Sequence, residues 1–193
     1  MIRFAEETDI PQILDIYGPY ILNTTASFEY TVPTREEFIA RFRGITSQFP
    51  WLVWEENGQI LGYAYGSAPF ERAAYQWSAE ASVYLRPEAQ GRGIGRQLYR
   101  VLEELLKSQG YARIYAIITS ENRASLAFHR ALGYREVAEL PGCGIKFGRV
   151  LGIKWMEKQL ISDEIPSNPP KEWRHIVKID RKFDHILAKM TLS

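Results

Sequence analysis

Residues 83–110, V-Y-L-R-P-E-A-Q-G-R-G-I-G-R-Q-L-Y-R-V-L-E-E-L-L-K-S-Q-G, decide the fold of this chain. They predict the end of a strand, a tight turn at residues 90–95 and then a helix, because glycine turns closely without a steric penalty. From Ile94 onward the apolar side chains recur with helical spacing, and Gly110 is placed to end the helix. A strand that leads through a glycine turn into a helix start presents unpaired N–H groups, which typically bind an anion such as phosphate.

Three kinds of phosphate loop can be compared with residues 90–95, Q-G-R-G-I-G. The Walker pattern needs a lysine after its last glycine, whereas Arg96 follows Gly95. The dinucleotide fingerprint needs a glycine three residues after Gly93, and that position is also Arg96. The pattern Q-x-x-G-x-G remains, and the plain alternative is a glycine-rich turn between a strand and a surface helix.

The composition is that of one globular domain with, at most, an appendage. The chain has 193 residues, of which 46% are hydrophobic, and a formal net charge of +1. Its basic residues are spread along the chain, so we expect no nucleic-acid partner. Cys143 is the only cysteine, which excludes a disulfide framework and fits a reducing compartment. The sequence shows neither a signal peptide nor a membrane-spanning apolar run, so we expect a cytoplasmic protein without a membrane partner.

The rest of the chain predicts strands and helices in alternation. Predicted strands begin or lie at residues 2–4, 51–56, 59–66, 75–85, 111–119, 134–137 and 154–160, and Asn57-Gly58 predicts a hairpin turn. Helices are predicted after Thr8 or Asp9, after the capping box at residues 34–37, at residues 94–109 and at residues 122–132. This order, β-α-α-β-β-β-α-β-α-β-β, predicts a mixed sheet covered by helices.

The C-terminal segment departs from this pattern. Residues 161–170 contain three prolines and predict a linker. Residues 171–193 predict an amphipathic helix that carries six Lys or Arg against three Asp or Glu. We expect its apolar stripe, including Trp173, Ile176 and Phe183, to pack on the main body or on a partner subunit. The alternative is a membrane-surface anchor.

Residues 122–134, N-R-A-S-L-A-F-H-R-A-L-G-Y, form a second informative run. Together with Q-x-x-G-x-G, this run resembles the motifs of the GNAT superfamily (general-control-related N-acetyltransferases), in which acetyl-CoA docks on a helix N-terminus. The position seven after the Asn is usually tyrosine in that superfamily, and here it is His129. This histidine, with W-S-A-E-A-S-V-Y at residues 77–84, is similar to the phosphinothricin and methionine sulfone acetyltransferase branch.

The resemblance covers residues 1–160 and leaves residues 161–193 outside it. It implies an α/β (α+β) fold, the GNAT fold, with a mixed, mostly antiparallel central sheet flanked by helices. It implies acetyl-CoA as the co-substrate, and we expect a homodimer. Its motifs place these residues at the coenzyme: Val83, Tyr84, Leu85, Gln90, Gly91, Arg92, Gly93, Ile94, Gly95 and Asn122.

One departure from the branch concerns the acceptor. The branch usually continues K-x-G-x-W-x-D, whereas residues 146–152 read K-F-G-R-V-L-G and lack the aromatic residue and the acid. This difference leaves the fold intact and predicts a shifted preference among amino-acid analogues.

Acetyl transfer to an amine needs a base for the amine and a proton for the leaving thiolate. Glu80 is the candidate base, although a glutamate's ordinary pKa of about 4.3 is too low unless burial beside Trp77 raises it or a water chain carries the proton. The alternative for Glu80 is a surface carboxylate on an alternating strand. His129 suits either acid or base duty, and its alternative is a helix histidine bonded to a carbonyl.

The remaining chemistry concerns the oxyanion that forms from the thioester carbonyl during acetyl transfer. It also concerns Cys143 and a metal ion, neither of which we expect to take part. A backbone amide near Val83 and Tyr84 is the candidate donor to the oxyanion. Cys143 lies in P-G-C-G, residues 141–144, which predicts a loop without a paired base and disfavours an acetyl-cysteine intermediate. No H-x-H, C-x-x-C or HExxH spacing occurs, so no metal is predicted.

An amino-acid acceptor brings a carboxylate, which needs a fixed cation. We expect Arg72 to bind it, with Phe28 and Tyr75 as walls and Lys146 as a second cation. The sequence thus predicts an N-acetyltransferase for a small amino acid or an analogue of the phosphinothricin or methionine sulfone kind. The alternative is a catalytically idle acetyl-CoA-binding module whose tail docks a protein partner.

Overall fold

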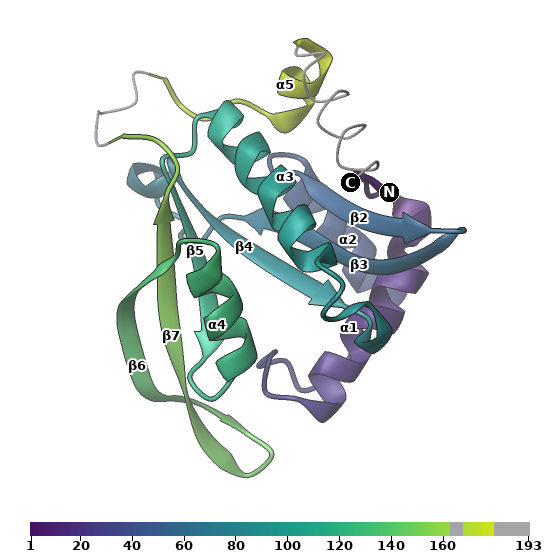
Figure 1. Cartoon of the computed structure of the whole chain (residues 1–193), viewed down its shortest axis with the longest axis vertical. Coiled ribbons are helices and arrows are strands. Elements are labelled where there is room, and N and C mark those ends of the chain that lie inside the picture. Colours follow the sequence, from purple (N-terminus) through teal and green to yellow (C-terminus); the bar gives the residue numbers. More distant parts are fainter. Residues whose placement is uncertain (163–167, 180–193) are drawn as a thin grey trace.

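A computed structural model describes residues 1–162 and 168–179 of the chain (Figure 1). One sheet runs through the described residues in the order β1-β2-β3-β4-β5-β7-β6. The strands are β1 (Ile2–Phe4), β2 (Trp51–Glu56), β3 (Gln59–Ser67), β4 (Ser78–Leu85), β5 (Arg113–Thr119), β6 (Arg135–Lys146) and β7 (Arg149–Gln159). The helices are α1 (Ile10–Asn23), α2 (Arg35–Thr46), α3 (Ile94–Gln109), α4 (Arg123–Ala131) and α5 (Trp173–Ile179).

Helices cover both faces of the sheet. Figure 1 shows α3 in front of the sheet and α2 behind it. Alternation along β2 divides the core, because Leu52 packs in the cluster that includes α3 whereas Trp51 and Val53 pack in the cluster of α1 and α2. Neighbouring strands of the described sheet are antiparallel except β4 and β5, which are parallel. The predicted mixed, mostly antiparallel sheet flanked by helices is therefore confirmed.

Local signals in the sequence form as predicted. Asn57 and Gly58 have φ angles of 51° and 79°, as a two-residue hairpin between β2 and β3 requires. Thr34 and Glu37 form the reciprocal capping box that begins α2. Gly110, with a φ of 102°, ends α3 in the left-handed conformation that favours glycine.

Several predictions of element bounds are wrong. The strand expected from Tyr111 begins at Arg113. The strand expected from Tyr75 begins at Ser78, because Ala73–Tyr75 forms a short 3-10 turn, η2, in which the amide of Tyr75 donates to the Arg72 carbonyl at 2.9 Å. Residues 141–144, expected to be a loop, lie within β6 at a shift of register between Leu140 and Gly144. A bulge accommodates the proline and glycines there without ending the strand.

The described part of the C-terminal segment packs against the sheet and α3. Trp173 stacks on Phe4 with ring centroids 4.5 Å apart, and its Nε1 donates to the Thr46 carbonyl at 2.9 Å. The side chain of Gln109 on α3 donates to the Lys171 carbonyl at 2.7 Å. The predicted contact of Phe183 lies outside the described residues. Residues 1–162 and 168–179 include no helix with the length and apolar character needed to cross a membrane.

Candidate active site

The site begins where β4 and β5 part in the middle of the sheet. These strands pair only from Ser78 to Glu80 on β4, against Arg113 to Tyr115 on β5. Beyond that point β4 stays paired with β3 as far as Leu85, and β5 stays paired with β7. The edge of β4 that faces the gap therefore carries backbone N–H and C=O groups that the sheet does not use.

Alternation along β4 decides which backbone groups face the gap. The amide of Arg86 donates to the Leu61 carbonyl of β3 at 2.8 Å, so the even-numbered residues bond to β3 and the odd-numbered ones face the gap. Accordingly, the Ala81 carbonyl accepts a hydrogen bond from the Tyr99 hydroxyl at 3.0 Å. The same alternation turns the amide of Val83 toward the gap.

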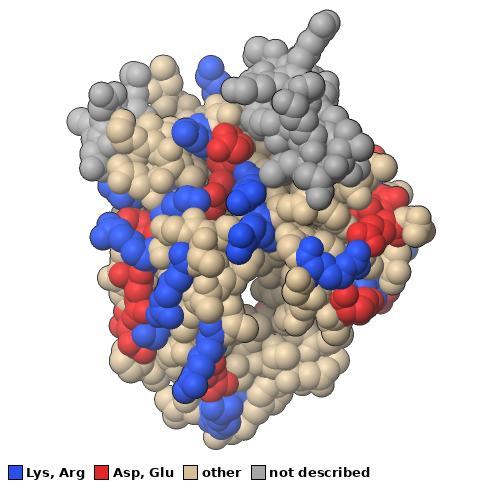
Figure 2. Space-filling model, in the orientation of Figure 1, with Lys and Arg blue, Asp and Glu red and all other residues tan. Residues whose placement is uncertain are grey.

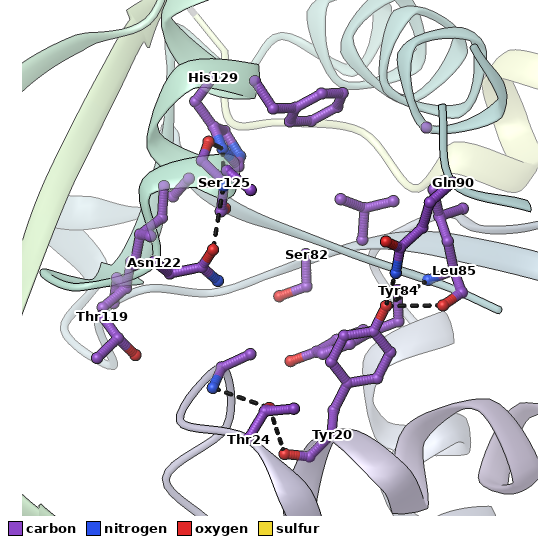
Figure 3. A pocket seen from close by; sticks show the side chains of 18 of the residues that line it. Tyr20, Thr24, Ser82, Tyr84, Leu85, Gln90, Thr119, Asn122, Ser125 and His129 are labelled. Atoms are coloured by element: carbon purple, nitrogen blue, oxygen red, sulfur yellow. Dashed lines mark hydrogen bonds between the residues drawn. The ribbon is translucent and has the colours of Figure 1, made fainter. Parts of the chain in front are cut away.

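A cavity of about 670 Å³ occupies this gap (Figure 3). Its walls are the parted ends of β4 and β5, the first turns of α3, the helix α4 and the segment at the end of α1. Figure 2 shows a hollow near the centre of this face, with acidic and basic side chains interspersed over the surface around it. The site is thus a cleft between two halves of one sheet.

The start of α3 is open for an anion at one end of this cavity. Gly91 and Gly93 have φ angles of 74° and 81°, so both take the left-handed conformation in the turn. Gly93 is the N-cap of α3 and has no side chain that could bond to the first amides of the helix. These amides and the positive end of the helix dipole are therefore available to a phosphate group.

Gly95 serves a different purpose, and the expectation that it forms part of the turn is wrong. It lies inside α3 and lines the cavity. A Cβ atom at this position would lie 3.4 Å from Leu85 Cδ1 and 3.5 Å from Phe128 Cε2. Glycine therefore keeps open the space between β4, α3 and α4, next to the free amides, which fits the phosphate-bearing arm of a coenzyme.

Most residues predicted to bind the coenzyme line the cavity, namely Val83, Tyr84, Leu85, Gln90, Gly91, Gly95 and Asn122. The other three belong to the loop. Gly93 caps α3, Ile94 is buried in the core, and the Arg92 side chain binds the Glu56 carboxylate at 2.9 Å. Arg92 can therefore contribute only its backbone to the binding of the coenzyme, because its side chain is bonded to Glu56.

Glu80 lies on β4 beside the gap. As an even-numbered residue it projects to the face covered by α1 and α2, opposite to Ala81, which packs in the cluster of α3. Burial raises the pKa of its carboxyl to about 7. The structure thus provides the desolvation that a glutamate needs to act as a base near neutral pH.

His129 lies on α4, on the opposite face of the sheet, and is 3% exposed. Its Nδ1 lies 2.8 Å from the Ser125 carbonyl, which can only accept, so Nδ1 carries a hydrogen. Its Nε2 lies 2.9 Å from the Tyr99 hydroxyl. Burial lowers the pKa of this imidazole below its ordinary value. His129 is thus a helix histidine bonded to a carbonyl, as one alternative expected. It also lines the cavity, as a proton-transfer role requires.

Two tyrosines of the site were not predicted from the sequence. Tyr20 on α1 donates to the Leu85 carbonyl at 2.7 Å, and the Gln90 side chain donates to its hydroxyl at 3.3 Å (Figure 3). Tyr99 follows Gly95 by one helical turn, and this spacing is the signal that could have placed it at the cavity. Tyr20 belongs to an apolar helix run and gives no such signal.

The predicted acceptor residues lie in two groups. Arg72 is exposed before η2, where Tyr75 packs on Phe70 with ring centroids 4.6 Å apart. Lys146 is 2% exposed, and its ammonium donates to the Ser27 carbonyl next to Phe28. Burial lowers the pKa of Lys146. The structure therefore places Lys146 against the segment that carries Phe28, and it holds Arg72 and Tyr75 on a separate loop.

Cys143 is exposed on β6 and unpaired. Within the ranges 1–162 and 168–179, no group of three or more His, Cys, Asp or Glu side chains could hold a metal ion.

A splayed strand pair beside an open helix start, with a half-buried carboxyl on one face and an imidazole on the other, fits a coenzyme-dependent acyltransferase. Residues 2–155 match the family described as acetyltransferase (GNAT) domain. The chain belongs to this family, and it is an acetyl-CoA-dependent N-acetyltransferase.

Three known proteins illustrate the relationship. An L-methionine sulfoximine/L-methionine sulfone acetyltransferase of Salmonella typhimurium is 35% identical, over 86% of this chain and 97% of the relative. The structure of a phosphinothricin acetyltransferase of Sinorhizobium meliloti in complex with acetyl-CoA is 34% identical, covers 90% of this chain and 98% of its own, and gives a TM-score of 0.84. The structure of a ribosomal-protein-alanine N-acetyltransferase from Brucella melitensis is 36% identical. It covers 82% of this chain and 99% of its own, and it gives a TM-score of 0.80. The resemblance to the phosphinothricin and methionine sulfone branch is confirmed, and the idle-module alternative finds no support.

The open space at Gly95 gives a direct test of the coenzyme site. Gly95→Val places a branched side chain between Leu85 and Phe128, so we expect affinity for CoA to fall about tenfold or more in a protein that stays folded. Calorimetry with CoA measures the affinity, and thermal melting checks the fold. Gly44→Ala on α2, where a Cβ meets nothing within 4 Å, is the matched control. Unchanged CoA affinity in folded Gly95→Val would contradict the site assignment.

Proposed function

We propose that this acetyltransferase acts on the α-amino group of a small amino acid or of an analogue of the phosphinothricin or methionine sulfone kind. The observation that carries the proposal is the half-buried carboxyl of Glu80, with its raised pKa, on the strand beside the gap. The names of the Salmonella and Sinorhizobium relatives support the class of acceptor.

Glu80 is proposed to remove the proton from the acceptor. An α-amino group has a pKa of about 8 and is mostly charged at neutral pH, so it must lose a proton before its lone pair can attack. A glutamate with an ordinary pKa of about 4.3 is too weak a base for this task. Burial brings the pKa of Glu80 to about 7, close to that of the amine, so its carboxylate can take the proton directly or through one water.

Bound acetyl-CoA supplies the activated acyl group. The residues proposed to hold it are the gap edge of β4, the open amides at the start of α3, and Asn122, whose Oδ1 caps α4 by accepting from the Ser125 amide at 3.1 Å. The amide of Val83 is proposed to donate to the acyl oxygen as negative charge develops on it. His129, on the opposite sheet face from Glu80, is proposed to hold or deliver a proton on the thiol side of the gap.

Replacing Glu80 by Gln keeps the shape of the side chain and removes the base. We expect kcat/KM to fall about 100-fold or more with little change in affinity for CoA. In the wild type, kcat/KM should rise with pH through about 7, because the carboxyl must be deprotonated to accept a proton. Kinetics over a pH series with saturating acetyl-CoA measure both effects.

A melting series controls for the fold of Glu80→Gln. The folded pKa of Glu80 is raised above its unfolded value, so its stabilising contribution is full below the unfolded pKa and is lost as pH rises through about 7. Above that pH, the Gln variant should therefore melt no lower than the wild type. If kcat/KM falls at acidic pH in the same way in Glu80→Gln and in the wild type, Glu80 is not the base.

Arg72 is the proposed partner of the acceptor carboxylate. It is exposed in the loop that leads into the strand of Glu80, whereas the ammonium of Lys146 is already bonded to the Ser27 carbonyl. The planar guanidinium suits a two-point contact with a carboxylate. Lys146 is proposed to contribute a second positive charge beside Phe28, where the acceptor's side chain would lie.

Arg72→Ala tests the acceptor class. We expect the KM for the acceptor amino acid to rise about tenfold or more, with the KM for acetyl-CoA within about twofold of wild type. Arg100→Ala, an exposed arginine on α3, is the control. Amino-acid amides and an alanine-terminated peptide serve as acceptors without a free α-carboxylate. If these react as fast as free amino acids and Arg72→Ala changes neither KM, the assignment is wrong.

We also propose that the protein is a homodimer that uses the hairpin of β6 and β7. Ile145, Phe147 and Val150 near its tip are 63%, 53% and 70% exposed, and β6 is an edge strand of the described sheet. Apolar side chains gathered at a sheet edge are typical of a protein contact surface. Sedimentation should give twice the chain mass of 22.3 kDa, and Ile145→Glu with Val150→Glu should give monomers. A monomeric wild type would overturn this proposal.

Two organisational proposals complete this picture. We propose that residues 1–160 form the acetyltransferase domain and that residues 161–193 are a linker and an appended helical segment. The contacts of Trp173 and Lys171 with the body support an appendage that packs on its own domain. We further propose a cytoplasmic location, which is supported by the exposed and unpaired thiol of Cys143.

A further inference from the structure

The hydroxyl of Tyr99 lies between two acceptors. Tyr99 is fully buried on α3, and its oxygen lies 3.0 Å from the Ala81 carbonyl and 2.9 Å from Nε2 of His129. Burial raises the pKa of this phenol well above its ordinary value, so the hydroxyl keeps its proton. It therefore has one hydrogen to donate and two groups that can receive it.

The other ring nitrogen decides which groups compete. Nδ1 of His129 donates to the Ser125 carbonyl at 2.8 Å, so in the neutral imidazole Nε2 has a lone pair and needs a donor. In the charged imidazolium, Nε2 carries a hydrogen and needs an acceptor. The oxygen of Tyr99 can meet either need, because a hydroxyl both donates and accepts.

Two hydrogen-bond arrangements follow from this geometry. When His129 is neutral, the Tyr99 hydroxyl donates to Nε2, and the Ala81 carbonyl is left free on the edge of the gap. When His129 is charged, Nε2 donates to the Tyr99 oxygen, and the hydroxyl hydrogen turns to the Ala81 carbonyl at 3.0 Å. No proton leaves Tyr99 in either case, since only the direction of its O–H bond changes.

We propose that Tyr99 is a positioning residue whose hydroxyl switches between His129 and the Ala81 carbonyl, so that His129 can gain and lose a proton in a buried site. Each state of the imidazole then has both nitrogens bonded, which avoids the free-energy penalty of an unpaired buried group. The role in turnover rests on the proposed function, in which His129 exchanges a proton.

The charged groups around His129 leave this hydroxyl as the partner of Nε2. On α3, the Glu103 carboxylate is bonded to Lys158 of β7. On its own helix, Arg130 is bonded to Glu136 at 3.3 Å. Glu80 of β4 projects to the other face of the sheet. The Tyr134 ring lies perpendicular to the imidazole with centroids 5.2 Å apart, and within the described residues its hydroxyl is not bonded to either ring nitrogen.

The test is a pH titration of His129 by NMR in the protein without acetyl-CoA. The chain has three histidines, and the His129 signals are identified by their loss in His129→Asn. In Tyr99→Phe the ring and its packing remain, but a buried imidazolium loses its acceptor, which costs more than the loss of a donor to the neutral ring. We therefore expect the ratio of charged to neutral His129 at a given pH to fall about fivefold.

Tyr134→Phe is the matched control, because it removes the hydroxyl of a second tyrosine whose ring packs against the same imidazole, and it should leave this ratio within about twofold. A Tyr99→Phe protein that titrates like the wild type, or a Tyr134→Phe protein that shifts as much, would overturn the proposal. The titration does not depend on the acceptor. A wild type that acetylates no amino acid would refute the proposed function, and the result for Tyr99 would still be decided.

Discussion

The parting of β4 and β5 is the constraint on which the rest of the structure depends. Each strand keeps a full antiparallel partner on its outer side, β3 for β4 and β7 for β5, so the sheet is held together at its centre by a short parallel contact. Beyond that contact, unpaired backbone groups must find other partners. Tyr20 donates to the Leu85 carbonyl, the Tyr99 hydroxyl lies 3.0 Å from the Ala81 carbonyl, and the amide of Val83 faces the gap.

The two titratable groups of the site, Glu80 and His129, come from opposite faces of the sheet. Burial raises the pKa of the Glu80 carboxyl to about 7 and lowers that of the His129 imidazole, because in both cases it disfavours the charged form. An amine on the side of α1 and α2 and a thiol on the side of α3 and α4 would each meet a separate proton carrier.

Two glycines and one buried lysine determine how much space is left around the site. Gly95 keeps the junction of β4, α3 and α4 open, and Gly144 lets the Phe28 ring lie against β6, since a Cβ there would come within 2.3 Å of that ring. Lys146 is buried beside Phe28 with its ammonium on the Ser27 carbonyl. Val150, at the position of the absent aromatic residue of W-x-D, is 70% exposed.

The sequence by itself determined the order of the elements, the hairpin at Asn57-Gly58, the caps of α2 and α3, and the family, because these depend on local turn chemistry, helical period and short motifs. It also pointed to Glu80, His129 and the loop at residues 90–95. Only the tertiary structure decided that Gly95 provides space and not a turn, that Arg92 is bonded to Glu56, and that Tyr20 borders the gap. These facts depend on which strands part and which helix faces meet across the gap. Such contacts join residues far apart in the chain, and no local pattern encodes them.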